Sequence, residues 1–226
     1  MILILYVFHE LNNRVYHFIN NCIFYDENID FIVISNNKNN NFSVPSYVKT
    51  LYRDNIGYDF GGWSEALLTN DLYKKYDKFI FVNSSVYGPF LQNKRDWVNI
   101  YLNGLNNNNI KLFGCTINTL RDPKNRSHVQ SYIFSINKNT LQYLIECQIF
   151  SMVNIAQTFD QAIWNKEVLM SRKIIEKGWN IGSLQMVYAG VDFTFKNRKR
   201  KDYKTPFYDD VMFPDLEYWG GKEELI

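Results

Sequence analysis

The chain has 226 residues, of which 46% are hydrophobic and 21% are charged, and such a composition excludes a disordered polypeptide. Its 25 Lys and Arg residues nearly balance 23 Asp and Glu residues, and a net charge of +2 gives no reason to expect nucleic acid as a partner. The length favours a single domain over residues 1–226. Cys22, Cys115 and Cys147 lie outside any C-x-x-C spacing, so neither disulfides nor a zinc site are expected and a cytoplasmic setting fits best.

The first predicted element is a buried strand at Ile2–Phe8. This apolar run lacks a basic flank, is too short to cross a bilayer and is followed at once by His9 and Glu10, so we expect neither a signal peptide nor a transmembrane segment. Similar runs alternate with helix-like stretches, and continuous apolar runs are typical of parallel strands covered on both faces. The sequence therefore predicts an α/β fold with a mostly parallel central sheet flanked by helices, and ligands bound beyond the carboxyl ends of the strands.

The remaining elements follow in chain order. The further predicted strands are Phe31–Ser35, Lys49–Arg53, Lys78–Val82, Lys111–Ile117 and Tyr132–Ile136. The predicted helices are Asn12–Tyr25, Ser64–Tyr76 with Ser64 as N-cap, Leu141–Phe150, and Asp160–Lys177 ended by Gly178 at the C′ position. The Asn-rich runs 36–41 and 103–109 predict solvated loops.

The most unusual segment is Arg-Asp-Asn-Ile-Gly-Tyr-Asp-Phe-Gly-Gly-Trp, from Arg53 to Trp63, between a predicted strand and a predicted helix. A backbone without Cβ atoms can approach a ligand closely, and a helix N-terminus favours negative charge, so the segment is a candidate diphosphate site. Gly61 and Gly62 could equally serve a tight turn and packing alone, and the residue types do not separate these two interpretations.

A second candidate segment is the polar triplet Asn83-Ser84-Ser85, which follows a predicted strand and precedes Gly88-Pro89. Asn83 and Ser85 are expected at the carboxyl end of the sheet, where a ligand would bind. An Asx or Ser turn that only caps the strand is the simpler interpretation, and the spacing alone favours it. A functional site requires that this triplet and the glycine-rich segment converge in space to bind pyrophosphate.

The two segments together resemble the rhamnan-synthesis-F-like glycosyltransferases, in which N-x-G-x-D-F-G-x-W is followed by an apolar strand and N-(D/S)-S-x-x-G-P. The segment from Ser127 to Tyr132 is similar to the family's H-x-Q-S-Y-F motif, with Ile133 where Phe is usual. The resemblance extends over residues 1–190. The residues that match the first two motifs are Asn55, Gly57, Asp59, Phe60, Gly61, Trp63, Asn83, Ser85, Gly88 and Pro89.

The resemblance implies a GT-A fold, with a nucleotide-sugar-binding half at residues 1–120 and an acceptor-side half at residues 121–226. It also implies inverting transfer of a sugar, L-rhamnose or another deoxyhexose, from a UDP, dTDP or GDP donor to a glycan or glycoprotein. The main alternative is a non-catalytic nucleotide-sugar or carbohydrate-binding module with a degenerate site. A methyltransferase or nucleotidyltransferase is a weaker alternative, because the G-x-G-x-x-G and Walker phosphate loops are absent from the sequence.

A divalent metal is uncertain, because many GT-A enzymes hold Mn²⁺ or Mg²⁺ with an Asp-x-Asp triplet where this chain has Asn83-Ser84-Ser85. Amide and hydroxyl oxygens are weaker ligands for a hard dication than carboxylates. Any metal would be held by Asp59 with Asn83 and Ser85. Arg53 or the basic run Lys196–Lys204 could instead neutralise phosphate, although a solvated surface is the more ordinary interpretation of that run.

An acceptor hydroxyl has to lose a proton as it attacks the anomeric carbon. The resemblance to GT-A segments in which an acidic residue precedes a G-W pair places this general base at Glu167, counted back from Gly178-Trp179, with Asp160 as second choice. A lone helical Glu is otherwise most often a solvent-exposed residue. His128 is either an acceptor or phosphate contact or a structurally satisfied histidine.

The nucleoside is expected over the ends of the first two strands. Aromatic side chains could form a sugar platform, although buried core positions are more common for them; these are Trp63, Tyr87, Trp164, Trp179 and Trp219. The predicted donor-binding residues are Phe8, His9, Ser35, Asn36, Arg53, Asn55, Gly57, Asp59, Gly61, Gly62, Asn83, Ser84 and Ser85, and the predicted acceptor-binding residues are His128, Ser131, Tyr132 and Trp164.

Overall fold

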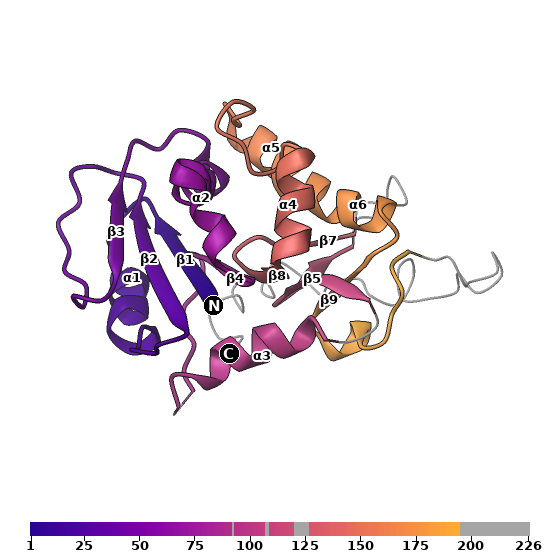
Figure 1. Cartoon of the computed structure of the whole chain (residues 1–226), viewed down its shortest axis with the longest axis horizontal. Helices are drawn as coiled ribbons and strands as arrows, with labels where there is room; N and C mark the ends of the chain where they lie inside the picture. Colours follow the sequence, from indigo (N-terminus) through magenta and orange to yellow (C-terminus); the bar gives the residue numbers. More distant parts are fainter. Residues whose placement is uncertain (92, 107–108, 120–126, 195–226) are drawn as a thin grey trace.

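The computed structural model describes residues 1–91, 93–106, 109–119 and 127–194, and its centre is a seven-stranded sheet in the order β3-β2-β1-β4-β8-β5-β9 (Figure 1). Neighbouring strands are parallel except where β8 pairs with β4 and β5. The predicted α/β fold with a mostly parallel sheet is therefore confirmed. The strands are β1 Ile2–Phe8, β2 Ile29–Ser35, β3 Lys49–Tyr52, β4 Lys78–Asn83, β5 Ile110–Gly114, β8 Ile133–Asn137 and β9 Asn180–Ser183, while β6 Ile117–Asn118 and β7 His128–Val129 form a separate antiparallel pair.

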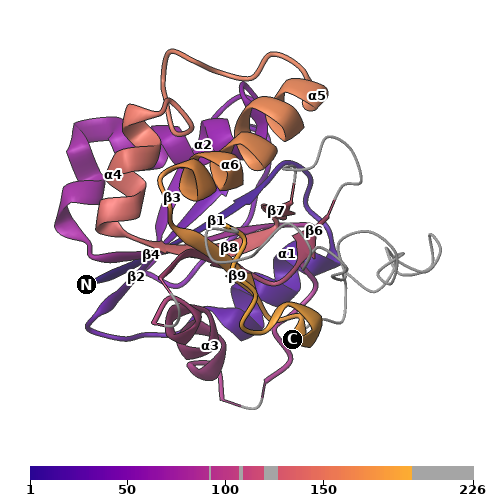
Figure 2. The same ribbon diagram turned by 90° about the vertical axis from the view of Figure 1, so that its right-hand side faces the viewer.

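Helices cover both faces of the sheet. Figures 1 and 2 show α2, α4 and α6 on one face and α1 and α3 on the other. No helix among the described residues is long and apolar enough to span a membrane. The helices are α1 Asn13–His17, which continues as the π-helix η1 Phe18–Cys22, then α2 Tyr58–Leu68, η2 Thr69–Lys75, α3 Asp96–Gly104, α4 Lys138–Glu146, α5 Phe159–Ala162, the π-helix η3 Ile163–Val168, α6 Leu169–Glu176 and η4 Met186–Tyr188.

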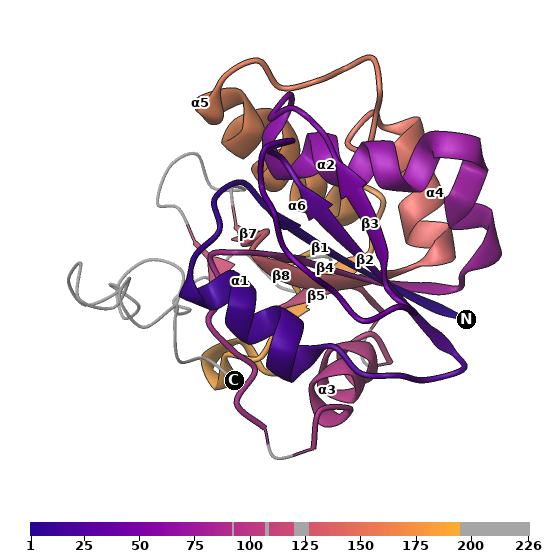
Figure 3. The same cartoon turned by 90° about the vertical axis from the view of Figure 1, so that its left-hand side faces the viewer.

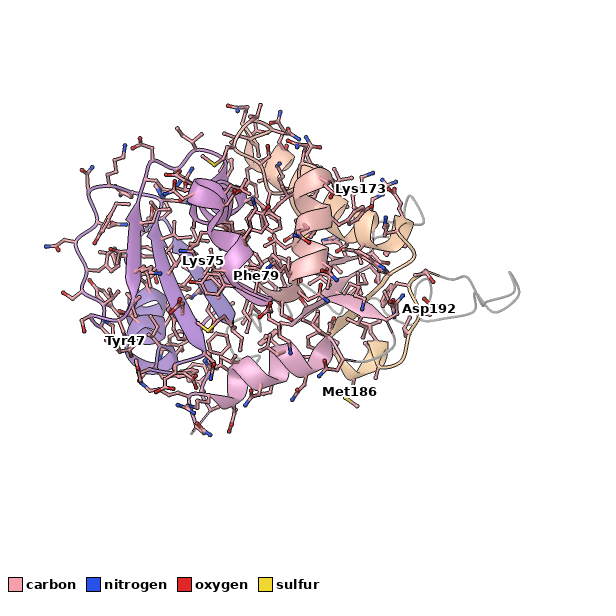
Figure 4. The ribbon with its side chains drawn as sticks, in the orientation of Figure 1. Tyr47, Lys75, Phe79, Lys173, Met186 and Asp192 are labelled. Carbon is pink, nitrogen blue, oxygen red and sulfur yellow. The ribbon has the colours of Figure 1, made fainter. Side chains whose placement is uncertain are left out.

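The central strands are mostly apolar because each supplies side chains to two hydrophobic cores. Successive side chains of a strand point to opposite faces. In β1, the side chains of Leu3, Leu5 and Val7 join the core under α2, α4 and α6, whereas those of Ile4, Tyr6 and Phe8 join the core over α1 and α3. Figure 4 shows that Phe79 of β4 lies in the interior, whereas Tyr47 and Met186 lie at the outer edge of the molecule.

The start of α2 corrects one prediction. The helix begins at Tyr58 and not at Ser64, because Gly57 adopts φ +78° as the N-cap and turns the chain into the helix six residues earlier. Ser64 is buried inside the helix, where its hydroxyl oxygen accepts a hydrogen bond from the Ser151 N–H at 3.0 Å. The second half of the glycine-rich segment, from Tyr58 onward, is therefore helical.

The other boundaries follow local capping. Asn137 accepts a hydrogen bond from the Thr140 N–H, so α4 starts before the predicted Leu141. The predicted long helix from Asp160 is confirmed as three consecutive segments, α5, η3 and α6, and Gly178 follows it with φ +83°. The predicted strand Lys111–Ile117 is split into β5 and β6. Helix α3 was not predicted, and it includes the first two residues of the Asn-rich run 103–109. Residues 107–108 of that run lie outside the described residues, and so do the basic run 196–204 and Trp219.

Candidate functional site

A cavity of about 490 Å³ opens at the carboxyl ends of β1 and β4. Figures 2 and 3 show that β1 runs toward the side of the molecule on which α5 and β7 lie. The volume is within the usual range for small-molecule sites. The cavity is lined by His9, Asn55, Tyr58, Asp59, Phe60, Asn83, Ser85, Asn118, His128, Gln130, Ser131, Tyr132, Phe159, Ala162, Ile163, Trp164, Glu167 and Val168.

The two segments singled out from the sequence meet in this cavity. The Asn83 side-chain amide, at the end of β4, donates a hydrogen bond to Asp59 Oδ2 in the first turn of α2 at 2.8 Å. The Asn83 Oδ1 atom also accepts a hydrogen bond from the Ser85 N–H at 2.9 Å. Asn83 thus forms the Asx turn that the simpler interpretation expected and also holds a cavity carboxylate. The required convergence of the two segments is present.

The environment of Asp59 alters its acidity. Burial raises the pKa of Asp59 to about 6; the hydrogen bond from Asn83 opposes this shift, and the charge of Glu167 adds to it. A carboxyl group with a pKa close to the working pH can change protonation when a ligand brings further charge. Asp59 is therefore sensitive to an anion or cation placed in the cavity.

Glu167 lies on the opposite wall, in η3. Its Oε2 atom accepts hydrogen bonds from both the N–H and the hydroxyl of Ser131 at 2.6 Å, and its Oε1 atom lies 3.4 Å from His128 Nε2. Burial alone would raise the pKa of Glu167, but the hydrogen bonds and charge of His128 and the two bonds from Ser131 outweigh burial and lower it below its ordinary value. Glu167 is therefore an ionised, fixed carboxylate at neutral pH.

The spacing of residues along η3 explains how several of its side chains reach one cavity. A π-helix closes i→i+5 hydrogen bonds, so residues four and five apart lie on the same side. Ile163 and Trp164 line the cavity, and so do Glu167 and Val168, four residues further along. Residues four apart share a face in an ordinary α-helix as well, so the spacing of these two pairs brings them to one cavity.

The side chains predicted to bind a metal ion, Asp59, Asn83 and Ser85, include only one carboxylate. Asn83 Oδ1 is already used by the Ser85 N–H, and the described residues contain no cluster of three His, Cys, Asp or Glu side chains that could hold a metal ion. Mg²⁺ is often held by one or two carboxylates together with substrate phosphates and water. Asp59 therefore fits a site shared with a phosphate ligand, whereas Asp59, Asn83 and Ser85 do not form a cage of their own.

Arg53 has its hydrogen bonds inside the protein. Its guanidinium donates to Glu65 at 2.8 Å, to Asn36 Oδ1 at 2.6 Å and to the Ile56 carbonyl at 2.6 Å, and the side chain is buried. Asn36 in turn donates to the Tyr58 carbonyl. These bonds connect the ends of β2 and β3 to the start of α2, and thereby position Asp59.

Other predicted site residues are also placed by the structure. The lining includes His9, Asn55, Asp59, Asn83, Ser85, His128, Ser131, Tyr132, Trp164 and Glu167, but not Phe8, Ser35, Asn36, Arg53, Gly57, Gly61, Gly62, Ser84 or Asp160. Phe8 and Ser35 are buried, and Asp160 is exposed. A Cβ on Gly61 would lie 2.1 Å from the Ile56 carbonyl oxygen, which gives this glycine a packing role. Ligand contacts of all these residues, inside and outside the lining, remain predictions.

Several residues of the cavity lining have no role predicted from the sequence. Gln130 was part of a recognised motif, but Asn118 lies in a strand of two residues, too short to produce a pattern. Tyr58 adopts φ +54°, a conformation that its residue type does not indicate. Among the candidate platform aromatics, Trp63 is fully buried in the core and Trp179 packs against Tyr143.

Comparison with protein families gives a match over most of the chain. The family model described as rhamnan synthesis protein F matches residues 31–197, a range that includes Asp59, Asn83, Ser131 and Glu167. No curated protein matches the chain. The matched range thus contains every residue that lines the cavity except His9.

Proposed function

The chain belongs to the rhamnan synthesis protein F family, and on this premise we propose that it is a glycosyltransferase with a GT-A fold. The proposed reaction moves a sugar, L-rhamnose or another deoxyhexose, from a nucleoside diphosphate to a glycan or glycoprotein with inversion at the anomeric carbon. Polysaccharide synthesis, with which the family is associated, requires the formation of glycosidic bonds. A mostly parallel sheet with a cavity at its carboxyl edge supports the proposal.

The observation that carries the proposal is the position of two carboxylates on opposite walls of one cavity. Asp59 is held by Asn83 on the wall formed by α2 and β4, and Glu167 is held by Ser131 on the wall formed by η3. Their pKa values are shifted in opposite directions, upward for Asp59 and downward for Glu167. Carboxyl groups whose environments differ in this way typically have different roles in one reaction.

The donor is assigned to the first wall. Asn55 and Asp59, with the first turn of α2, would hold the donor, and Asn83 and Ser85 would lie beside its diphosphate. The positive end of the α2 dipole favours an anion at this place. A Mg²⁺ or Mn²⁺ ion bound by Asp59 would neutralise charge on the departing diphosphate.

The proton of the acceptor hydroxyl is assigned to Glu167. As the acceptor oxygen forms its bond to the anomeric carbon, the bond from that carbon to the diphosphate oxygen breaks and its electron pair leaves with the phosphate. The attacking hydroxyl becomes more acidic as its oxygen gains positive charge, so a carboxylate with a lowered pKa can still accept the proton late in the step. The two hydrogen bonds from Ser131 fix the orientation of the Glu167 carboxylate.

A donor-binding and transfer experiment tests the proposal. The pure protein is screened by thermal shift against UDP, dTDP and GDP sugars, since a ligand that binds the native state raises its melting temperature. The variant Glu167→Gln should bind the donor as the wild type does and lose transfer. Absence of stabilisation by every nucleotide sugar would count against the function, and transfer retained by Glu167→Gln would remove the assignment of the base.

A binding module without catalysis is the second candidate. It is favoured by the neutral Asn83, which stands where many GT-A enzymes have a carboxylate. Such a module would bind a nucleotide sugar but neither transfer nor hydrolyse it. Release of the nucleoside diphosphate from a bound donor, measured with and without acceptor, separates the two candidates.

A further inference from the structure

Two large aromatic side chains are exposed at the cavity. Phe159, the first residue of α5, is 65% exposed, and Trp164 of η3 is 42% exposed, although both line the cavity. By contrast, Trp63 and Trp97 are fully buried. Apolar rings exposed at the wall of a concave site, and not scattered on the surface, indicate a ligand-binding surface.

The backbone holds these rings in place. The Thr158 hydroxyl accepts a hydrogen bond from the Gln161 N–H and caps the first turn of α5, which begins at Phe159. The rings of Tyr58 and Phe159 meet edge to face, with centroids 6.0 Å apart and an interplanar angle of 68°. Tyr58 adopts φ +54°, an uncommon conformation for a residue with a side chain, and residues held in such conformations cluster at ligand sites.

One of the two rings, that of Trp164, shares its supporting element with the proposed base, and Phe159 lies in α5, which leads directly into that element. Trp164 and Glu167 both belong to η3 and both line the cavity, whereas Asp59 and Asn83 belong to the other wall. The cavity-lining set contains no lysine or arginine among the described residues, and Asn118 and Gln130 contribute neutral amides next to β6 and β7. This side of the cavity therefore suits a neutral ligand with one apolar face and several hydroxyl groups.

We propose that Phe159 and Trp164, with Tyr58 at the edge of Phe159, form a stacking subsite for a pyranose ring of the acceptor. This inference rests on the proposed glycosyl transfer and adds the acceptor's binding mode. The C–H face of the sugar lies on the aromatic rings, its hydroxyl groups face Asn118 and Gln130, and the attacking hydroxyl points toward Glu167. A nucleobase would also stack on aromatic rings, but Asn83 and Ser85, proposed to lie beside the diphosphate, follow β4, whereas Phe159 and Trp164 belong to α5 and η3. Tyr58 alone comes from the first turn of α2.

Saturation-transfer NMR with a simple glycoside tests the subsite without donor or turnover. Methyl α-L-rhamnopyranoside should receive saturation from the wild-type protein, most strongly at the C–H protons of one ring face. Phe159→Ala and Trp164→Ala should each weaken its binding by about three- to tenfold, and Trp164→Phe should retain most of it. The matched control is Phe90→Ala, which removes a phenylalanine that is 50% exposed and does not line the cavity.

Each contrary result is informative. Equal binding by the wild type and both alanine variants would overturn the subsite, and so would the absence of saturation transfer to the glycoside in the wild type. Displacement of the glycoside by uridine from the same rings would assign them to the donor base instead. If both alanine variants transfer sugar with the acceptor KM of the wild type, the stacking subsite is wrong although the glycosyl transfer is correct. If the glycoside binds but no sugar is transferred, the proposed function is wrong although the subsite is correct.

Discussion

The side-chain amide of Asn83 and the carboxylate of Asp59 join the end of β4 to the first turn of α2 through a hydrogen bond of 2.8 Å. The bond fixes both groups at the cavity wall, because Asn83 is held from its other side by the Ser85 N–H. A neutral side chain at this position stabilises the charged form of Asp59, whereas a second carboxylate would oppose it.

Replacing Asn83 by Ala should therefore raise the pKa of Asp59 above about 6. The folded-state pKa is higher than the ordinary value of 3.8, so the contribution of Asp59 to stability is present at low pH and is lost as the pH rises through the folded-state value. Asn83→Ala should increase this loss at neutral pH and cost about 1–3 kcal/mol. Carbon-detected NMR titration and urea unfolding measure the two effects. The control is Ser84→Ala, and an unchanged Asp59 titration would contradict the role of Asn83.

Replacing Ser131 by Ala should raise the pKa of Glu167, because the carboxylate loses the hydroxyl donor and keeps only the backbone donor. The pKa of Glu167 is lowered in the folded state, so its contribution to stability is present above the unfolded-state pKa and is lost as the pH falls through the folded-state pKa. The acid limb of the rate profile for transfer should move to higher pH in Ser131→Ala. Ser131→Thr keeps the hydroxyl and should retain the wild-type limb; a limb that stays in place in Ser131→Ala would show that another group titrates.

Replacing Arg53 by Met should destabilise the protein by about 1–3 kcal/mol, because the Asn36 Oδ1 atom loses its buried donor and Glu65, whose side chain is 32% exposed, loses its cation. Guanidinium unfolding measures this loss. Arg53→Lys keeps the charge but not the three directed bonds, and should fall between Met and the wild type. If Arg53→Lys were as stable as the wild type but no longer bound the nucleotide, the predicted phosphate contact would be supported instead of the structural role.

The buried Lys166 should make the stability of the fold depend on pH in a different way. Its ammonium group is buried and donates to the carbonyls of Gln148, Ile149 and Asn154. Burial lowers its pKa from 10.5 to about 8, so the unfolded state binds more protons between these values and stability should rise with pH across that window. Lys166→Met should abolish this rise and, with three carbonyls left without their donor, lower stability at pH 7. Thermal unfolding at several pH values checks both effects, with Lys177→Met as an exposed control; a rise that persists in Lys166→Met would assign it to another group.

The parts of the fold that could be predicted are those with continuous apolar runs. β1, β2 and β4 are buried on both faces, and this produces the uninterrupted Ile, Val and Phe runs seen in the sequence. The start of α2 could not be predicted, because it depends on positive φ angles at Gly57 and at Tyr58, a residue type that rarely adopts them. A capping rule based on Ser64 therefore gave the wrong boundary.

The residues of the candidate site that belong to a recognised sequence motif could be predicted. Asp59, Asn83, Ser131 and Glu167 were all expected to take part, and the structure brings them to one cavity. Phe159 was missed because one exposed phenylalanine at a helix start has no periodic signal. Its significance depends on tertiary packing, which places it against Tyr58, about a hundred positions earlier in the chain.

The alternation of β1 side chains between two cores also fixes the length of this strand. A residue inserted within β1 would turn every later side chain of the strand to the opposite face of the sheet. The side chain of Val7 would then point toward α1 and α3, and that of Phe8 toward α2. His9, which follows the strand directly, would leave the cavity wall. Natural variants of this protein should therefore tolerate insertions in the loop after β2 far better than a single added residue in β1.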